Sequence, residues 1–192
     1  MELNASYWDN RYRNNDSPWD IGYESPAIRA YFEKIKDKNA RILIPGAGNA
    51  YEAEFLFRHG FKNVFVLDFS HKALENFSKR VVDFPVSQMI CCDFFEHKAK
   101  YDLVIEQTFF CAIDPVLRPN YVIKMHNLLN ESGRLVGLLF NDPNLKGNPP
   151  YGGTINEYKE LFMNPFFLTI EESKQSISPR AGREVFIDFL RK

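Results

Sequence analysis

The chain has 192 residues, of which 45% are apolar, and its formal net charge at pH 7 is −1. This length fits one domain with a sizeable core, and the apolar fraction excludes a disordered chain. The small net charge, with no long run of either sign, argues against nucleic acid and anionic membrane as partners. No apolar stretch reaches the length that spans a bilayer, so no membrane contact is expected.

Cysteine usage points to a reducing compartment. The only cysteines are Cys91, Cys92 and Cys111. Cys91 and Cys92 are adjacent and would point to opposite faces of a strand, so we do not expect them to pair. The odd count, together with a first segment that lacks the regions of a signal peptide, predicts a cytoplasmic protein. No His/Cys spacing resembles a ligand set, so no metal site is expected. Nothing in the composition demands a partner subunit, and we expect a monomer.

The first 23 residues are polar and aromatic, and apolar periodicity begins after them. Residues 26–37 follow helical spacing. Strands are predicted at 42–44, 64–67, 87–92, 101–110 and 135–140. Helices are predicted between them at 51–59, 70–81 and 114–130, and Gly133 is expected to end the last of these helices. A loop rich in Asn, Pro and Gly covers 141–153, a helix covers 154–163, and two alternating strands at 166–171 and 184–190 end the chain.

The order of these elements predicts the fold class. Strands that alternate with helices form a mostly parallel sheet with helices on both faces, which is an α/β fold. The final pair of strands, joined by a hairpin-type connection, predicts an antiparallel strand at the edge of that sheet. The whole chain, residues 1–192, is therefore expected to form one domain.

The first strand runs directly into the turn Gly46-Ala47-Gly48, and a helix follows. About twenty residues later, a second apolar run ends in Asp68. Together these features outline a nucleotide-binding βαβ unit in which an acid accepts hydrogen bonds from a ribose diol. A plain capping role for Asp68 in the next helix is the alternative.

Residues in the first turn of that helix indicate which class of nucleotide the site would bind. Tyr51 stands where the dinucleotide fingerprint requires a third glycine, and Glu52 and Glu54 follow it. A pyrophosphate at this helix N-terminus would meet two carboxylates. A cationic nucleoside without phosphate fits better, and S-adenosylmethionine is such a molecule.

Polar residues also follow the third and fourth strands. Asp93 closes the third strand and Gln107 the fourth. Ligands of open α/β sheets bind at these carboxyl ends. Asp93 and Phe94 are expected beside the adenine, although Asp93 could equally cap a turn.

The aromatic segment 1–23 contains both tryptophans, Trp8 and Trp19. We interpret this segment as a lid whose aromatic faces cover the cofactor, attract its sulfonium by cation–π interaction and exclude water. The alternative is that both tryptophans only pack a leading helix onto the core.

Motifs spread over nearly the whole chain resemble one family. In chain order they are Trp8-x-x-x-Tyr12, Ser17-Pro18-Trp19-Asp20-x-Gly22, Ile44-Pro45-Gly46-x-Gly48, Phe109-Phe110-Cys111-Ala112-Ile113-Asp114-Pro115-x-x-Arg118-Pro119 and Gly147-Asn148-Pro149-Pro150-Tyr151. They resemble the thiopurine S-methyltransferase-like family of class I S-adenosylmethionine methyltransferases, closest to its halide/thiol (thiocyanate) branch. The resemblance implies a Rossmann-like sheet of order 3-2-1-4-5-7-6 with strand 7 antiparallel.

The resemblance also implies roles for individual residues. The residues expected to bind the cofactor are Trp8, Tyr12, Trp19, Gly46, Gly48, Asp68, Asp93, Phe94 and Gln107. Arg118 and Tyr151 are expected near the acceptor as catalytic residues. Tyr12 replaces a tryptophan expected in the plant enzymes, and Gln107 replaces a tyrosine beside the acceptor pocket, which leaves the preferred acceptor open.

The implied reaction is in-line displacement at the methyl carbon of S-adenosylmethionine by a small soft nucleophile. Candidate acceptors are a thiol, sulfide, thiocyanate, halide or thiopurine, and Arg118 would favour an anionic acceptor. Two other functions stay open at this point. One is an NAD-linked oxidoreductase, and the other is a non-catalytic nucleotide-binding module. The tetrapeptide Asn148–Tyr151 spells an amino-methylation motif, but it follows the fifth strand rather than the fourth, and we interpret it as coincidence.

Overall fold

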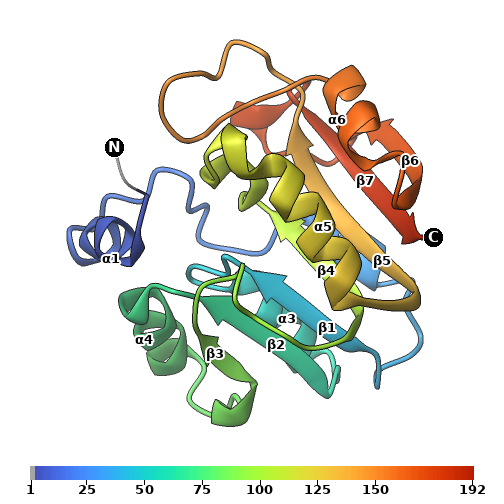
Figure 1. The fold of residues 1–192 in the computed structure, drawn as a ribbon. Coiled ribbons are helices and arrows are strands. Elements are labelled where there is room, and N and C mark those ends of the chain that lie inside the picture. Colours follow the sequence, from blue (N-terminus) through green and yellow to red (C-terminus); the bar gives the residue numbers. More distant parts are fainter. Residues whose placement is uncertain (1–2) are drawn as a thin grey trace.

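Seven strands form a single sheet in the computed structural model, which describes residues 3–192 (Figure 1). The strands are β1 (Arg41–Pro45), β2 (Asn63–Asp68), β3 (Met89–Cys91), β4 (Tyr101–Gln107), β5 (Leu129–Phe140), β6 (Phe166–Glu172) and β7 (Glu184–Arg191). The first two residues of the predicted lid segment lie outside the described residues. The α/β class predicted from the sequence is confirmed.

The sheet has the order β3-β2-β1-β4-β5-β7-β6. The pairs from β3 to β5 are parallel, and β7 is antiparallel to both β5 and β6. The order implied by the family resemblance is therefore confirmed. The expectation from the hydrophobic pattern, that the antiparallel strand lies at the edge, is wrong. Val185, Ile187 and Phe189 of β7 are buried, whereas Phe167 of β6 is exposed, so β6 is the strand that tolerates the edge.

Helices cover both faces of the sheet. They are α2 (Pro26–Phe32), α3 (Tyr51–Arg58) and α4 (His71–Arg80) on one face, and α5 (Arg118–Leu128) and α6 (Ile155–Phe162) on the other. Each face has its own apolar cluster. Strand β1 contributes residues to both clusters, because successive side chains of a strand point to opposite faces. Ile42 and Ile44 pack under α2 and α3, and Leu43 packs on the side of α5.

Several boundaries differ from the sequence prediction. The helix predicted at 26–37 ends at Phe32, because Lys34 and Ile35 donate to carbonyls only three residues back and continue as tight turns. Gly133 does not break a helix: α5 ends at Leu128 and Gly133 lies inside β5. Short 3-10 turns occupy Val86–Gln88, Phe110–Ala112, Pro115–Leu117 and Ser178–Arg180.

The predicted lid segment contains a helix, α1 (Ala5–Arg13), which the apolar periodicity of the sequence did not predict. Asn4 begins it by accepting a hydrogen bond from the Tyr7 backbone N–H at 3.0 Å. Figure 1 shows α1 standing apart from the sheet, next to α4, with a long connection leading back to the body of the molecule. Tyr12 is the buried residue of α1, so the helix depends on tertiary contacts for its position.

Candidate active site

One cavity of about 1000 Å³ lies at the carboxyl ends of the central strands, beneath the lid segment. Its lining includes every residue predicted to bind the cofactor: Trp8, Tyr12, Trp19, Gly46, Gly48, Asp68, Asp93, Phe94 and Gln107. These residues come from five separate parts of the sequence. The fold therefore brings the whole predicted set to one place.

The turn after β1 forms the floor of the cavity. Gly46 and Gly48 have φ values of +57° and +54°, a region that residues with a Cβ rarely adopt. A Cβ on Gly46 would lie 2.1 Å from the ring of Phe109, and one on Gly48 would lie 2.5 Å from the hydroxyl of Tyr12. Both glycines are thus required by backbone conformation and by the close approach of aromatic residues.

Asp68 ends β2 and is 6% exposed. Its Oδ2 accepts from the Gly48 N–H and its Oδ1 from the Ser70 N–H, both at 2.8 Å. Burial raises the pKa of Asp68 to about 6, against the effect of these two hydrogen bonds. Each carboxylate oxygen can accept a second hydrogen bond. Asp68 therefore closes a turn with Ser70, while Ser70 itself is the N-cap of α4, and Asp68 keeps the capacity to accept from a ligand as well.

At the end of β3, Asp93 and Phe94 border the cavity in different ways. Asp93 is exposed, and its Oδ1 accepts from the Phe95 N–H at 2.7 Å, so it does close a turn. Phe94 is buried and packs edge-to-face against Phe109, with ring centroids 5.1 Å apart. The pair offers one apolar wall and one solvent-facing carboxylate.

The turn after β4 is held from behind by Glu106. Its Oε1 accepts from the backbone N–H groups of Phe109 at 2.9 Å and Phe110 at 2.8 Å, and its Oε2 accepts from the Tyr121 hydroxyl. Burial raises the pKa of Glu106 to about 7. Gln107 lines the cavity, and its side-chain carbonyl oxygen is buried without a protein hydrogen-bond partner. Such an orphaned acceptor is what a ligand donor would satisfy.

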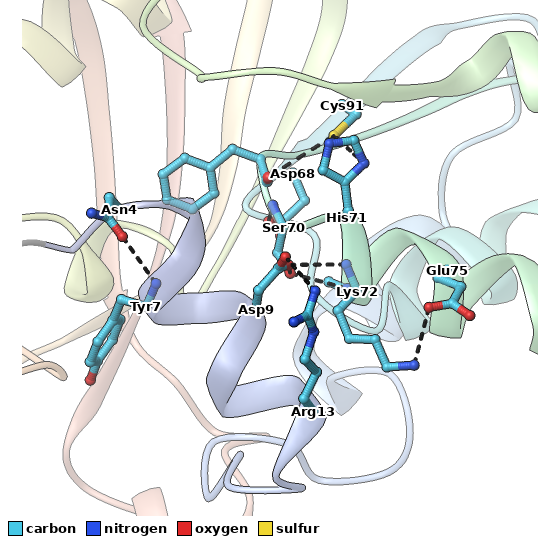
Figure 2. A network of polar contacts seen from close by, with 12 residues as sticks. Asn4, Tyr7, Asp9, Arg13, Asp68, Ser70, His71, Lys72, Glu75 and Cys91 are labelled. Carbon is cyan, nitrogen blue, oxygen red and sulfur yellow. Dashed lines mark hydrogen bonds and ion pairs between the residues drawn. The ribbon is translucent and has the colours of Figure 1, made fainter.

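The lid residues contact one another over the cavity. The rings of Trp8 and Trp19 meet edge-to-face with centroids 5.4 Å apart, and Tyr12 meets Trp19 at 6.0 Å. Several side-chain hydrogen bonds tie the lid to the body, among them the one that the Asn49 amide donates to the Asp20 carboxylate. Asp9 of α1 bonds to the start of α4, as Figure 2 shows, and the Arg180 guanidinium donates to the Trp19 carbonyl at 2.9 Å.

Arg118 and Tyr151, predicted near the acceptor, do not line this cavity. Arg118 is 7% exposed, donates to the Gly152 carbonyl at 2.8 Å and lies 4.6 Å from the centroid of the Phe110 ring. The Tyr151 N–H donates to the Cys111 carbonyl at 2.7 Å. These contacts support the loop that carries Pro149 and Pro150. A direct contact of Arg118 or Tyr151 with the acceptor stays a prediction that this geometry does not support.

Sequence reasoning missed Arg180, which lines the cavity and is 9% exposed. It lies in the connection between β6 and β7, 3.5 Å from the Glu184 carboxylate. The sequence predicts a hairpin-type connection here, and no local pattern marks an arginine that lines the cavity. Cys111, which follows β4, also lines the cavity. Burial raises the pKa of its thiol to about 12, so it stays a neutral thiol.

Comparison with known proteins identifies the family. Residues 3–188 match the family described as thiopurine S-methyltransferase. The chain belongs to this family. It is 30% identical over 190 residues to a protein named probable thiol methyltransferase 2 from Arabidopsis thaliana, covering 95% of this chain and 84% of that one. It is 28% identical to thiocyanate methyltransferase 1 from Brassica oleracea, covering 92% of this chain and 81% of that one.

Solved structures support the fold. The 1,6-didemethyltoxoflavin-N1-methyltransferase from Burkholderia thailandensis, solved with bound 1,6-didemethyltoxoflavin and S-adenosylhomocysteine, superposes with a TM-score of 0.73 at 18% identity. The match covers 99% of this chain and 87% of that one. Family membership makes the chain an S-adenosylmethionine-dependent methyltransferase of small nucleophiles, as the resemblance implied. The oxidoreductase and non-catalytic alternatives are not supported. None of the helices in residues 3–192 is long and apolar enough to cross a membrane.

Proposed function

We propose that the cavity binds S-adenosylmethionine and that the enzyme methylates a thiol, sulfide, thiocyanate or halide. The observation that carries the proposal is the convergence of a buried carboxylate, a two-glycine turn and an aromatic lid on one cavity. The volume of about 1000 Å³ lies at the upper end of small-molecule sites, so it has room for a nucleoside cofactor and a second small molecule.

The residues in the cavity fit this cofactor. Asp68 has acceptor capacity for the ribose diol, and Gln107 has an orphaned carbonyl oxygen for a donor such as an ammonium or amino group. Gly46 and Gly48 keep the floor free of side chains where the amino-acid end would lie. Phe94 offers an apolar face to the adenine, worth about 0.5–1.5 kcal/mol beyond area burial.

When bound, the cofactor supplies a methyl group already activated on a sulfonium. The protein then contributes position and an environment. Trp8, Tyr12 and Trp19 cover the site, exclude water and present ring faces to a cation. Holding an acceptor in line with the methyl group can contribute roughly 7–11 kcal/mol to the reduction of the barrier.

At the acceptor side, Arg180 is the buried cation that borders the cavity. A guanidinium beside a thiol favours the thiolate, which is the nucleophilic form, and it attracts thiocyanate and halide directly. Among residues 3–192, no histidine lines the cavity. We therefore assign no imidazole base to the reaction. The neutral thiol of Cys111 does not compete for the methyl group. The printed names of the relatives, thiol and thiocyanate methyltransferase, favour the same acceptors.

We assign Arg118 and Tyr151 an indirect role. Arg118 holds the Gly152 carbonyl, and the Tyr151 N–H holds the Cys111 carbonyl, so both fix the wall formed by Pro149 and Pro150. We further propose that the enzyme acts as a monomer in the cytoplasm. Its three cysteines are free thiols, which suits a reducing compartment.

The test is a methyl-transfer assay with labelled S-adenosylmethionine against iodide, thiocyanate, hydrosulfide, an aromatic thiol and a thiopurine. Turnover with any small anion or thiol supports the proposal, and the order of preference shows whether the pocket suits an anion or an aromatic ring. Binding of S-adenosylmethionine without turnover on all five would refute the proposed acceptors and keep the cofactor. Absence of binding would refute both.

A further inference from the structure

Asp9 lies on α1, the lid helix, and bonds to the start of α4. Its Oδ1 accepts from the Ser70 hydroxyl at 2.6 Å and from the Lys72 backbone N–H at 3.0 Å. Arg13, one turn later on α1, lies 3.5 Å from Oδ2. Figure 2 shows these contacts between the two helices. The residues are 61 and 63 positions apart in sequence, so this is a tertiary contact rather than a local cap.

The contact supplies something that α4 lacks. The first turn of α4 contains no acidic residue of its own. Unsatisfied N–H groups and the partial positive charge at a helix N-terminus favour a carboxylate there. Ser70 caps α4 by accepting from the Ala73 N–H at 3.1 Å, and Asp9 completes the cap from another helix. The cap is therefore shared between the lid and the body.

Ser70 also connects the lid to the cofactor site. Its backbone N–H donates to Asp68 at 2.8 Å, and its hydroxyl donates to Asp9 at 2.6 Å. Ser70 is fully buried, and its hydrogen bond to Asp68 is shielded from water, whereas the one to Asp9 is part-buried. The carboxylate proposed to take the ribose and the carboxylate that anchors the lid are thus bonded to the same residue.

The position of Asp9 on α1 fixes which face of that helix meets the cavity. Trp8 and Tyr12 are four residues apart, so they lie on one face, and both line the cavity. Asp9 is about 100° around the helix from Trp8 and faces α4 instead. We propose that Asp9 is a positioning residue that docks α1 on α4 and so holds Trp8 and Tyr12 over the bound S-adenosylmethionine. This inference rests on the proposed cofactor.

The experiment compares binding of S-adenosylmethionine, without any acceptor, to the wild type and to variants of the full chain. Asp9→Ala removes both hydrogen bonds, and Asp9→Asn keeps an acceptor oxygen but removes the charge. Glu75→Ala is the matched control, because Glu75 is an exposed carboxylate on α4 that pairs with Lys72 and Lys79 and does not line the cavity. Calorimetry gives the affinity. Since both tryptophans of the chain, Trp8 and Trp19, are in the lid, intrinsic fluorescence reports the lid directly.

Asp9→Ala is expected to weaken binding by about tenfold, the scale of one lost charge-assisted hydrogen bond, and to change the fluorescence response to the cofactor. Asp9→Asn should recover part of the affinity, and Glu75→Ala should match the wild type. Wild-type affinity and fluorescence response in Asp9→Ala would overturn the inference, as would a loss of melting temperature with unchanged affinity. If Asp9→Ala does not fold, unchanged affinity in Asp9→Asn together with an unchanged fluorescence response overturns it. Failure of the wild type to bind would instead refute the proposed cofactor.

Discussion

Replacing Asp68 with alanine tests the cofactor site through its most buried charge. The variant removes an acceptor from the ribose diol, and a hydrogen bond to a charged group contributes about 1.5–3 kcal/mol. The dissociation constant for S-adenosylmethionine should therefore rise by about 10- to 150-fold. The fold should survive. The Gly48 and Ser70 N–H groups lose their acceptor, which lowers the free energy of unfolding by about 1–3 kcal/mol each. Removing a buried carboxylate whose pKa is raised from 3.8 to about 6 offsets this loss by about 3 kcal/mol at neutral pH.

Calorimetric titration at pH 7.5 (about 1.5 units above the pKa of Asp68) measures the effect, and thermal melts check the fold. Asp102→Ala is the matched control. Asp102 accepts from the Arg41 N–H at 2.8 Å and from the Asn130 amide at 2.7 Å, but it lies at the amino end of β4 and not in the cavity. The control should lose stability and keep its affinity for the cofactor.

The pH dependence provides a second check on Asp68. Because its pKa is about 6, the carboxylate takes up a proton as the pH falls through that value and loses acceptor capacity. Wild-type affinity for S-adenosylmethionine should fall below pH 6, and Asp68→Ala should not show this fall. A folded Asp68→Ala protein with wild-type affinity at pH 7.5 would refute the ribose assignment.

Three further variants test the surroundings of the site. Gly48→Ala should lower the free energy of unfolding by about 1–2 kcal/mol, because Gly48 has a positive φ. The added Cβ should also displace the Tyr12 hydroxyl and weaken cofactor binding, and a melting temperature and affinity equal to those of the wild type would contradict this. In Glu106→Gln, the free energy of unfolding should depend less on pH. The pKa of Glu106 is about 7 in the folded wild type and 4.5 in the unfolded chain, so between these values the folded state binds an extra proton and stability falls as the pH rises. An unchanged pH dependence in denaturant titrations of the variant would exclude the effect. Arg118→Lys should raise the KM of the acceptor and leave cofactor affinity unchanged, whereas an equal loss in both would assign Arg118 to the cofactor side.

The parts of the fold that were predictable from sequence are those with local causes. The stretch from β1 to Asp68 combines apolar runs, two glycines at a turn and an acid at a strand end, and each of these constrains the backbone on its own. The family motifs added the strand order. Periodicity alone placed the antiparallel strand at the edge, because it cannot compare the burial of β6 with that of β7.

The parts that were missed depend on contacts between distant residues. Helix α1 has a local cap at Asn4, but its docking relies on Asp9 reaching α4 across more than sixty residues. Arg180 reaches the Trp19 carbonyl across 161 residues. The family resemblance predicts a functional role for Arg118, but whether its guanidinium faces the cavity or a backbone carbonyl is decided by packing against Phe110.

The hydrogen bond from Arg180 to Trp19 has a consequence for how the enzyme is made. Synthesis proceeds from the N-terminus, so the lid segment and the two-glycine turn leave the ribosome long before residue 180. Until then, the Trp19 carbonyl lacks its guanidinium donor, and β7 is absent from its place between β5 and β6. The cavity therefore lacks the Arg180 side of its wall and the Arg180–Trp19 tie to the lid until this part of the chain has been synthesised.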